Sequence, residues 1–380
     1  MAIGNDLLKK PRLFYDKLRE PFVGRDEEAL TIVLALLSGE HLIIIGEPGT
    51  AKSALARRAA RLLNVRFFKY LLTRFTEPSE LFGPLDINAL RKGIYKRITT
   101  SKLPDAEIAF LDEIFNANSA VLNSLLSILQ ERLLYDGYSE IRVPLWSLVS
   151  ASNRIPDEPE LDALYDRLLY RHIVKPVSEE FWGELLDRAW SIEKGDFEDV
   201  KPVMSSNDFL ELNKLVFQVD LTDIKQSLLR LFAILEDSGM HLTDRRKSKA
   251  LKAIAAHAIF EGRLKAKVED LFVLKYIAPS DAEDFDKITN ILLEELRTPE
   301  KILVELGEIE RNTETIGREV EKLKSFDPKL VEIYRSLKTA RRRVAMISRM
   351  SDDPRIADKV DSLINRIDNL LDEVTSKLGM

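Results

Sequence analysis

Apolar runs alternate with helical segments through the first half of the chain. Five runs have the length and the β-branched or aromatic content of buried strands, at residues 41–45, 65–71, 107–112, 145–152 and 170–174. The segments between them contain strong helix formers. Because strands that alternate with helices usually form a parallel sheet, we expect a doubly wound α/β domain with five strands over residues 1–177.

Two further stretches predict hairpins beside this sheet. Residues 94–99 alternate apolar and polar side chains after Gly93, which is typical of one hairpin arm. Residues 132–143 carry Asp136-Gly137 between two alternating runs, and Asp-Gly is a strong turn signal.

The rest of the chain has the pattern of helices. Residues 178–280 predict an all-α domain, and residues 281–380 predict long charged helices with apolar side chains at alternating four- and three-residue steps. Asp327-Pro328 and Asp352-Asp353-Pro354 would divide this coiled-coil-like tail into three helices. We expect them to pack on one another rather than form an open arm, because a local partner has the higher effective concentration.

We interpret this tail as a separable recruitment module. Arg341-Arg342-Arg343 would lie on its middle helix, either as plain surface charge or as a docking site for an acidic client. A chain that ends near Ala278 is accordingly expected to stay soluble and to keep its activity.

Composition narrows the classes of function. The 57 basic and 63 acidic side chains give a net charge of −6, which argues against a nucleic-acid surface over the whole chain but leaves open a local basic channel. The absence of cysteine excludes disulfides and thiolate metal sites, and the four histidines lack metal-ligand spacing. With neither a signal-peptide pattern nor an apolar run long enough for a bilayer, we expect a soluble cytoplasmic protein.

The clearest chemical motif follows the first strand. Gly46-Glu47-Pro48-Gly49-Thr50-Ala51-Lys52-Ser53 stands between a buried strand and a helix, the context of a phosphate-binding loop. Its backbone N–H groups would surround the phosphates, Lys52 would reach the β- and γ-phosphates, and Ser53 would hold Mg²⁺. Ala51 replaces the usual second glycine, and we expect it at helical φ/ψ, which alanine accepts.

Polar side chains end two other predicted strands. Asp112 and Glu113 follow the third strand, at the carboxyl edge where open α/β sheets bind ligands. Asp112 would bind Mg²⁺, directly or through water, and Glu113 would polarise the water that attacks the γ-phosphate. Asn153, after the fourth strand, would orient that water or touch the γ-phosphate, although an asparagine there is more often a turn residue.

Taken together, these motifs resemble an AAA+ ATPase of the MoxR family, most closely its RavA-like branch. The resemblance covers about the first 280 residues and rests on Phe22-Val23-Gly24-Arg25, the phosphate loop, Leu81-Phe82-Gly83-Pro84, Ile108-Ala109-Phe110-Leu111-Asp112-Glu113, Ala151-Ser152-Asn153, Leu164-Tyr165-Asp166-Arg167 and Thr243-Asp244-Arg245-Arg246. It implies an αβα core, an all-α lid and a ring, usually a hexamer, that binds ATP between subunits.

The resemblance also assigns roles to residues outside the phosphate loop. It implies that Val23, Gly24 and Ala54 contribute to the nucleotide site. Arg167 resembles the arginine finger that reaches a neighbour's γ-phosphate, with Arg171 as the second candidate. Arg245 resembles the second sensor, which touches the nucleotide of its own chain, with Arg246 as the alternative.

Three classes of function compete at this point. The favoured one is a Mg²⁺-dependent ATPase that remodels or matures a protein or metal-cofactor client, and the family resemblance suggests a VWA-domain partner. A nucleic-acid motor of the same branch is the second, and a nucleotide-gated scaffold with little turnover is the third. The Asp112-Glu113 pair weighs against the scaffold, because a pure switch does not need a water-activating carboxylate.

Overall fold

The chain separates into two compact units. The computed structural model describes residues 6–136, 139–156, 158–296, 299–323, 327, 329–347 and 354–378. One unit comprises residues 1–289 and the other residues 290–380, so the division lies inside helix α12 (Ala282–Glu295). Within the described residues, no helix is both long enough and apolar enough to cross a bilayer.

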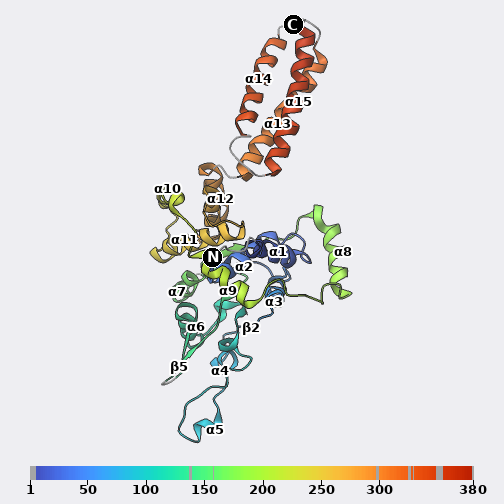
Figure 1. Cartoon of the computed structure of the whole chain (residues 1–380). Helices are drawn as coiled ribbons and strands as arrows, with labels where there is room; N and C mark the ends of the chain where they lie inside the picture. The colour runs from blue at the N-terminus through green and yellow to red at the C-terminus, as the bar shows by residue number, and fades with distance from the viewer. Residues whose placement is uncertain are drawn as a thin grey trace. The chain divides into compact units, whose positions relative to one another are not determined.

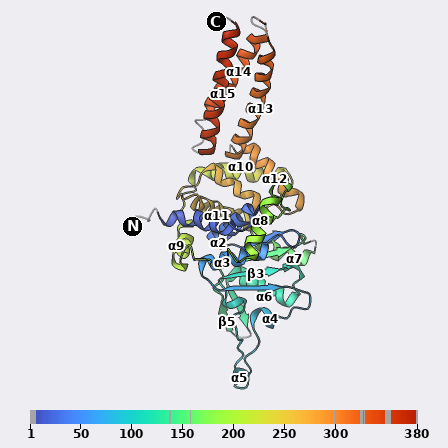
Figure 2. The same cartoon turned by 90° about the vertical axis from the view of Figure 1, so that its right-hand side faces the viewer.

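The first unit is built on a five-stranded parallel sheet, in agreement with the sequence prediction (Figures 1 and 2). Its strands lie side by side in the order β2 (Phe67–Leu71), β3 (Ile108–Asp112), β6 (Ser147–Ser152), β1 (Leu42–Ile45) and β7 (Tyr170–Ile173). The side chains of β1 and β6 are buried along their whole length, as expected for central strands covered on both faces. The carboxyl ends of all five strands therefore meet at one edge.

Helices surround this sheet and continue into an all-helical region. The α-helices of this unit before α12 are α1 (Lys10–Arg19), α2 (Asp26–Ser38), α3 (Lys52–Leu63), α4 (Pro78–Phe82), α5 (Ile87–Leu90), α6 (Ser119–Glu131), α7 (Pro159–Arg167), α8 (Trp182–Glu193), α9 (Ser206–Val216), α10 (Lys225–Asp237) and α11 (Asp244–Phe260). Short 3₁₀ segments lie at η1 (Leu7–Lys9), η2 (Leu103–Asp105), η3 (Ile114–Asn116), η4 (Glu179–Phe181), η5 (Thr222–Ile224) and η6 (Val268–Tyr276). Helix α2 is apolar on nearly every side because it packs against α1, α9, α11 and β7.

One of the two predicted hairpins is reduced to a single antiparallel bridge. Residues 94–99 form no strand; they follow the short helix α5 and make a single bridge between Leu85 and Arg97. Gly93 turns the chain with a φ of +74°, and the side chains after it lie mostly in solvent. The N–H of Asp86 donates to the carbonyl of Lys96 and the N–H of Ile98 to that of Pro84, so the pairing extends only one residue to each side of the bridge. The other hairpin is confirmed as β4 (Leu133–Asp136) and β5 (Ser139–Arg142), although Gly137 of its predicted turn lies outside the described residues.

The second unit is a three-helix bundle of α13 (Pro299–Lys322), α14 (Lys329–Ile347) and α15 (Pro354–Leu378). Its core takes apolar side chains from all three helices, which confirms that the tail folds on itself. Thr313, the one polar residue of the α13 seam, is buried and donates its hydroxyl to the carbonyl of Ile309 at 2.7 Å. Such a bond satisfies the hydroxyl inside an apolar core.

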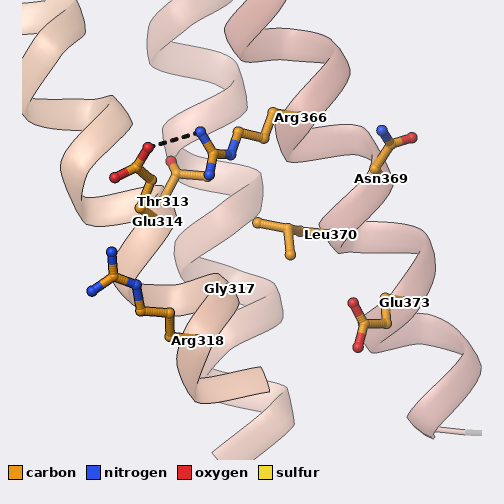
Figure 3. Close-up of a pocket in the computed structure, with 8 residues that line it drawn as sticks. All are labelled: Thr313, Glu314, Gly317, Arg318, Arg366, Asn369, Leu370 and Glu373. Carbon is orange, nitrogen blue, oxygen red and sulfur yellow. Dashed lines mark hydrogen bonds and ion pairs between the residues drawn. The ribbon is translucent and has the colours of Figure 1, made fainter. Parts of the chain in front are cut away.

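The predicted basic patch of the bundle is partly neutralised. Arg341 pairs with Asp368 of α15, and Arg343 pairs with Glu305 of α13 at 2.7 Å. A recess of about 350 Å³ lies elsewhere, between α13 and α15, where Gly317 leaves room beside Leu370 (Figure 3). An ion pair between Glu314 and Arg366, at 2.9 Å, crosses this recess.

Candidate functional site

The phosphate-loop segment leaves the end of β1 through a tight approach that requires glycine. Gly46 has a φ of +152°, and a Cβ built there would lie 2.4 Å from Cγ1 of Val174. The N–H of Gly46 donates to the carbonyl of Ser152 at 2.9 Å, which ties the loop to the end of β6. Gly49 has a φ of +86°, again in the region that favours glycine. The backbone conformation therefore requires or favours glycine at both positions of the motif.

Lys52 is folded back over this loop. Its Nζ donates to the carbonyls of Gly46 and Glu47 at 2.8 and 2.7 Å and contacts Oγ1 of Thr50 at 3.3 Å. Burial lowers the pKa of Lys52, and the negative charges of Asp112 and Glu113 act in the opposite direction. The loop cation and the two predicted catalytic carboxylates therefore interact electrostatically.

Ala51 has a conformation that the sequence prediction got wrong. Its φ is +63° and its ψ +13°, so it is the left-handed residue that precedes α3 rather than part of that helix. The chain must reverse direction before Lys52, and a left-handed residue makes that turn. Since the left-handed region costs a residue with a Cβ roughly 1–2 kcal/mol, Ala51 is strained where the common motif has glycine.

We predict that Ala51→Gly raises the free energy of unfolding by about 1 kcal/mol. The gain is the released strain, reduced by the larger conformational entropy of glycine in the unfolded chain. Ala54→Gly is the matched control, because Ala54 is exposed in the first turn of α3 and glycine there should destabilise by roughly 1 kcal/mol. Urea unfolding of the two variants measures both changes. A loss of stability in Ala51→Gly would contradict the assigned strain.

Asp112 and Glu113 lie at the carboxyl end of β3, as predicted. Asp112 is the last residue of the strand, and its Oδ1 accepts the N–H of Glu113 at 3.2 Å. Glu113 has a φ of +51° and caps η3, a turn that the sequence did not predict. This left-handed residue redirects the chain immediately after the strand, so the two carboxylates do not follow the simple alternation of a strand.

Ser53 has a neighbour that the sequence analysis missed. Nζ of Lys69, from β2, donates to the Ser53 hydroxyl at 3.1 Å. Lysine on an edge strand is ordinarily a solvent-exposed residue, so nothing in the sequence singled it out. Asn153 follows β6 directly and is exposed beside the strand end to which the loop is tied.

Two of the candidate arginines lie together. Arg167, at the end of α7, donates to Oε1 of Gln130 at 2.7 Å. Arg245, in the first turn of α11, donates to Oδ2 of Asp166 at 3.0 Å and to the same Gln130 oxygen at 3.4 Å. Gln130 had no sequence signal, because glutamine near the end of a helix is common. The predicted finger and the predicted second sensor thus form one cluster.

The other two candidate arginines are buried. Arg171 and Arg246 are each 2% exposed, and both donate to the carbonyl of Pro279, at 2.7 and 3.1 Å. Arg171 also lies over the ring of Tyr165, with its Cζ 3.5 Å from the ring centroid. Burial and the nearby Arg171 lower the pKa of Arg246 to about 9. Both side chains hold the segment that leads into α12.

The residues before α2 lie near the carboxyl end of β7, at the same edge of the sheet as the phosphate loop. Gly24 has a φ of +64°, and a Cβ there would lie 3.5 Å from Val177; Val23 precedes it and is half-buried. Arg25, which the sequence analysis did not select, is buried and donates to the carbonyl of Lys175 at 2.9 Å. Its charge also contributes to the lowered pKa of Lys52. These contacts join the Val23-Gly24 turn to the chain after β7.

Comparison with known proteins identifies this arrangement. A family model described as the MoxR domain in MoxR-vWA-beta-propeller ternary systems matches residues 9–214, and an AAA lid domain matches residues 218–292. The chain belongs to the MoxR family of AAA+ ATPases. An uncharacterized protein of Methanocaldococcus jannaschii is 39% identical over 278 residues, which are 72% of this chain and 72% of that protein.

Further proteins are similar to this MoxR-family chain in sequence or in fold. A second uncharacterized protein of the same archaeon is 32% identical over 386 residues, covering 97% of this chain and all of the relative. The chaperone MoxR1 of Mycobacterium tuberculosis is 27% identical over 203 residues, 52% of each chain. A crystal structure of a Cytophaga hutchinsonii protein, provisionally described as an ATPase, shares the fold with a TM-score of 0.64 at 19% identity, covering 77% of this chain and 96% of that one.

Proposed function

We propose that this MoxR-family chain hydrolyses ATP with Mg²⁺ and uses the energy to remodel or mature a client. The observation that carries the proposal is the position of Lys52 over a loop whose conformation requires glycine, with Nζ on the carbonyls of Gly46 and Glu47, at the edge of the sheet where Asp112 ends β3. Lys52 would leave the loop carbonyls for the β- and γ-phosphates, and Glu113 would take a proton from the attacking water.

The donor set of this chain suits magnesium. A hydroxyl oxygen of Ser53 and a carboxylate of Asp112 are hard oxygen ligands, and Mg²⁺ in nucleotide sites is completed by phosphate oxygens and water. Among the described residues, no group of three or more His, Cys, Asp or Glu could hold a metal ion alone, which fits a metal that arrives with the nucleotide. When bound, Mg²⁺ would neutralise charge on the phosphates.

We further propose that Arg167 and Arg245 both serve the pocket of a neighbouring subunit in a ring, usually a hexamer in this family. Their shared contact with Gln130 supports a common target. Arg171 is the weaker candidate for the finger because its guanidinium is buried on backbone carbonyls of its own chain. Assigning Arg245 to the neighbour's nucleotide departs from the role in its own chain that the family resemblance implied.

We also propose what kind of client the chain acts on. The matching MoxR model is described from systems that pair MoxR with vWA proteins, and MoxR1 is named a chaperone, so we propose a VWA-domain partner and a chaperone-like role. A cytoplasmic location belongs to the same proposal, because ATP is supplied there. Recruitment of the client is assigned to the three-helix tail.

The purified chain is the test of this function. We expect phosphate release from ATP that stops when EDTA removes Mg²⁺ and changes little when DNA is added. Turnover that rises strongly with DNA and falls with salt would instead support a nucleic-acid motor. Nucleotide binding without phosphate release would support a gated scaffold.

The contacts of Pro279 and α12 show that a chain without the tail should end later than Ala278. A chain that ends at Ala278 loses the Pro279 carbonyl that accepts from Arg171 and Arg246, and buried charges left without partners are costly. Helix α12 is also tied to the first unit, because Lys287 donates to the Ser238 carbonyl.

We therefore predict that a chain ending at Leu296 keeps basal turnover and a wild-type melting temperature. The matched chain that ends at Ala278 should melt lower or precipitate, because it lacks the contacts of Pro279 and α12. Calorimetry and phosphate release measure both chains. Loss of turnover in the longer chain would show that the bundle belongs to the ATPase itself.

A further inference from the structure

Lys69 of β2 brings a second ammonium group to the phosphate loop. Its Nζ donates to the Ser53 hydroxyl at 3.1 Å, whereas Nζ of Lys52 lies on the loop carbonyls of Gly46 and Glu47. The two lysines therefore approach the loop from different elements, one from the helix that follows it and one from the edge strand of the sheet. The hydroxyl that Lys69 contacts is also the one that we assign to Mg²⁺.

The register of the sheet places Lys69 on the face that carries Asp112. Strands β2 and β3 pair in parallel, with Lys69 opposite Phe110 and Leu71 opposite Asp112. Opposite residues share a face, and every second residue of a strand returns to it, so the side chains of Lys69 and Asp112 extend from the same face. Helix α3, which carries Ser53, packs on β3. Lys69 therefore lies on the same side of the sheet as the two oxygen ligands proposed for magnesium.

No carboxylate of the described residues is paired with Lys69. Within that part of the chain, its side chain contacts the Ser53 hydroxyl and the ring of Phe110, with Nζ 5.9 Å from the ring centroid. The first turn of α3 contains no acidic side chain. The ammonium of Lys69 therefore adds to the positive end of the helix dipole, at the helix terminus that we assign to the phosphates.

The Ser53 hydroxyl cannot serve two cations equally well. A serine hydroxyl has two lone pairs, the one that accepts from Lys69 is not available to a metal, and two cations held at the same oxygen repel each other. We propose that Lys69 and Mg²⁺ compete for this hydroxyl, and that Lys69 replaces part of the charge of the metal when nucleotide binds without it. Lys69 thereby sets how strongly nucleotide binding depends on Mg²⁺. The inference rests on the proposed function, because it assigns both cations to the phosphates.

The test compares the ADP affinity of the full chain in excess Mg²⁺ with its ADP affinity in EDTA, both by calorimetric titration. In Lys69→Met the affinity in EDTA should fall by about tenfold or more, because a charge-assisted contact is lost. The affinity in Mg²⁺ should stay equal or rise, so the ratio of the two affinities should increase by about tenfold or more. Lys69→Arg keeps the charge and should keep the wild-type ratio. Lys214→Met, at an exposed position of α9, is the matched control and should change neither affinity.

The ratio of the two affinities separates this role from a merely structural one. A structural role would lower both affinities together, so an unchanged ratio in Lys69→Met would overturn the inference. Lys69→Gln gives the same comparison if the methionine variant does not fold, as judged by its melting curve. Wild type that binds no ADP in either condition would refute the proposed function and this inference with it. Wild type that releases phosphate from ATP, together with an unchanged ratio in the variant, would refute only the role of Lys69.

Discussion

Glu113→Gln should bind ATP with close to wild-type affinity and lose about 10²–10⁴-fold of its turnover. Glutamine keeps the size of the side chain and its hydrogen-bonding capacity but cannot accept the proton of the attacking water, and a positioned general base contributes rates of that order. Lys52→Ala should fail earlier, at binding. It removes the ammonium that lies on the loop carbonyls of Gly46 and Glu47 and that we assign to the phosphates.

Calorimetric titration with ATP and single-turnover phosphate release separate the two effects. Glu308→Gln, at an exposed position of α13, is the matched control and should change neither quantity. Equal loss of affinity in Glu113→Gln and Lys52→Ala would show that the two residues do not divide binding and chemistry as proposed.

The elements that the sequence predicted well share one physical property. Strands β1, β3 and β6 are buried along almost their whole length, so their residues are mostly apolar or small, and that pattern is visible without a structure. The order of Lys52 and Ser53 after such a strand likewise fixes their approximate position, since a loop of six residues can reach only the strand end. The tail was predictable because a coiled-coil-like seam can be buried only by another seam.

The predictions failed where local conformation depends on a turn or on a distant partner. Ala51 and Glu113 both adopt left-handed φ values that their residue types disfavour, and the surrounding chain imposes them. Residues 94–99 alternate like a strand but pair with residues 84–86 only at the Leu85–Arg97 bridge, and alternation alone cannot show how far a pairing extends. Lys69 reaches Ser53 only through the packing of α3 over the sheet, which no motif reports.

The arginine cluster shows a second limit of sequence motifs. Arg167 and Arg245 belong to motifs almost 80 residues apart, and the resemblance gave them nucleotides in different subunits. Packing of α11 near α7 brings both to Gln130, and Asp166 accepts from both Arg245 and Thr243. The position of a helical domain on the core determines which nucleotide pocket its arginine can reach. A sequence motif carries no information about that position.

Mixing two inactive variants should therefore restore activity. In a ring, an Arg167→Ala subunit keeps an intact pocket and an adjacent Lys52→Ala subunit keeps an intact finger, so some interfaces of a mixed ring are complete. Because an arginine finger contributes about 10³-fold or more to phosphoryl transfer, even a few complete interfaces should stand above the background of either variant alone. Turnover is measured against the ratio of the two variants at constant total protein.

The same mixture made with Arg245→Ala separates the two possible roles of that residue. If Arg245 serves the neighbour, Arg245→Ala and Lys52→Ala subunits together recover turnover as the Arg167 mixture does. If it serves the nucleotide of its own chain, each intact pocket still lacks its arginine, and no ratio of subunits recovers activity. Arg171→Ala is the control, because its buried contacts with Pro279 and Tyr165 predict a lower melting temperature and no recovery specific to mixing. Recovery with Arg171→Ala but not with Arg167→Ala, in rings shown by native mass spectrometry to be mixed, would move the finger to Arg171.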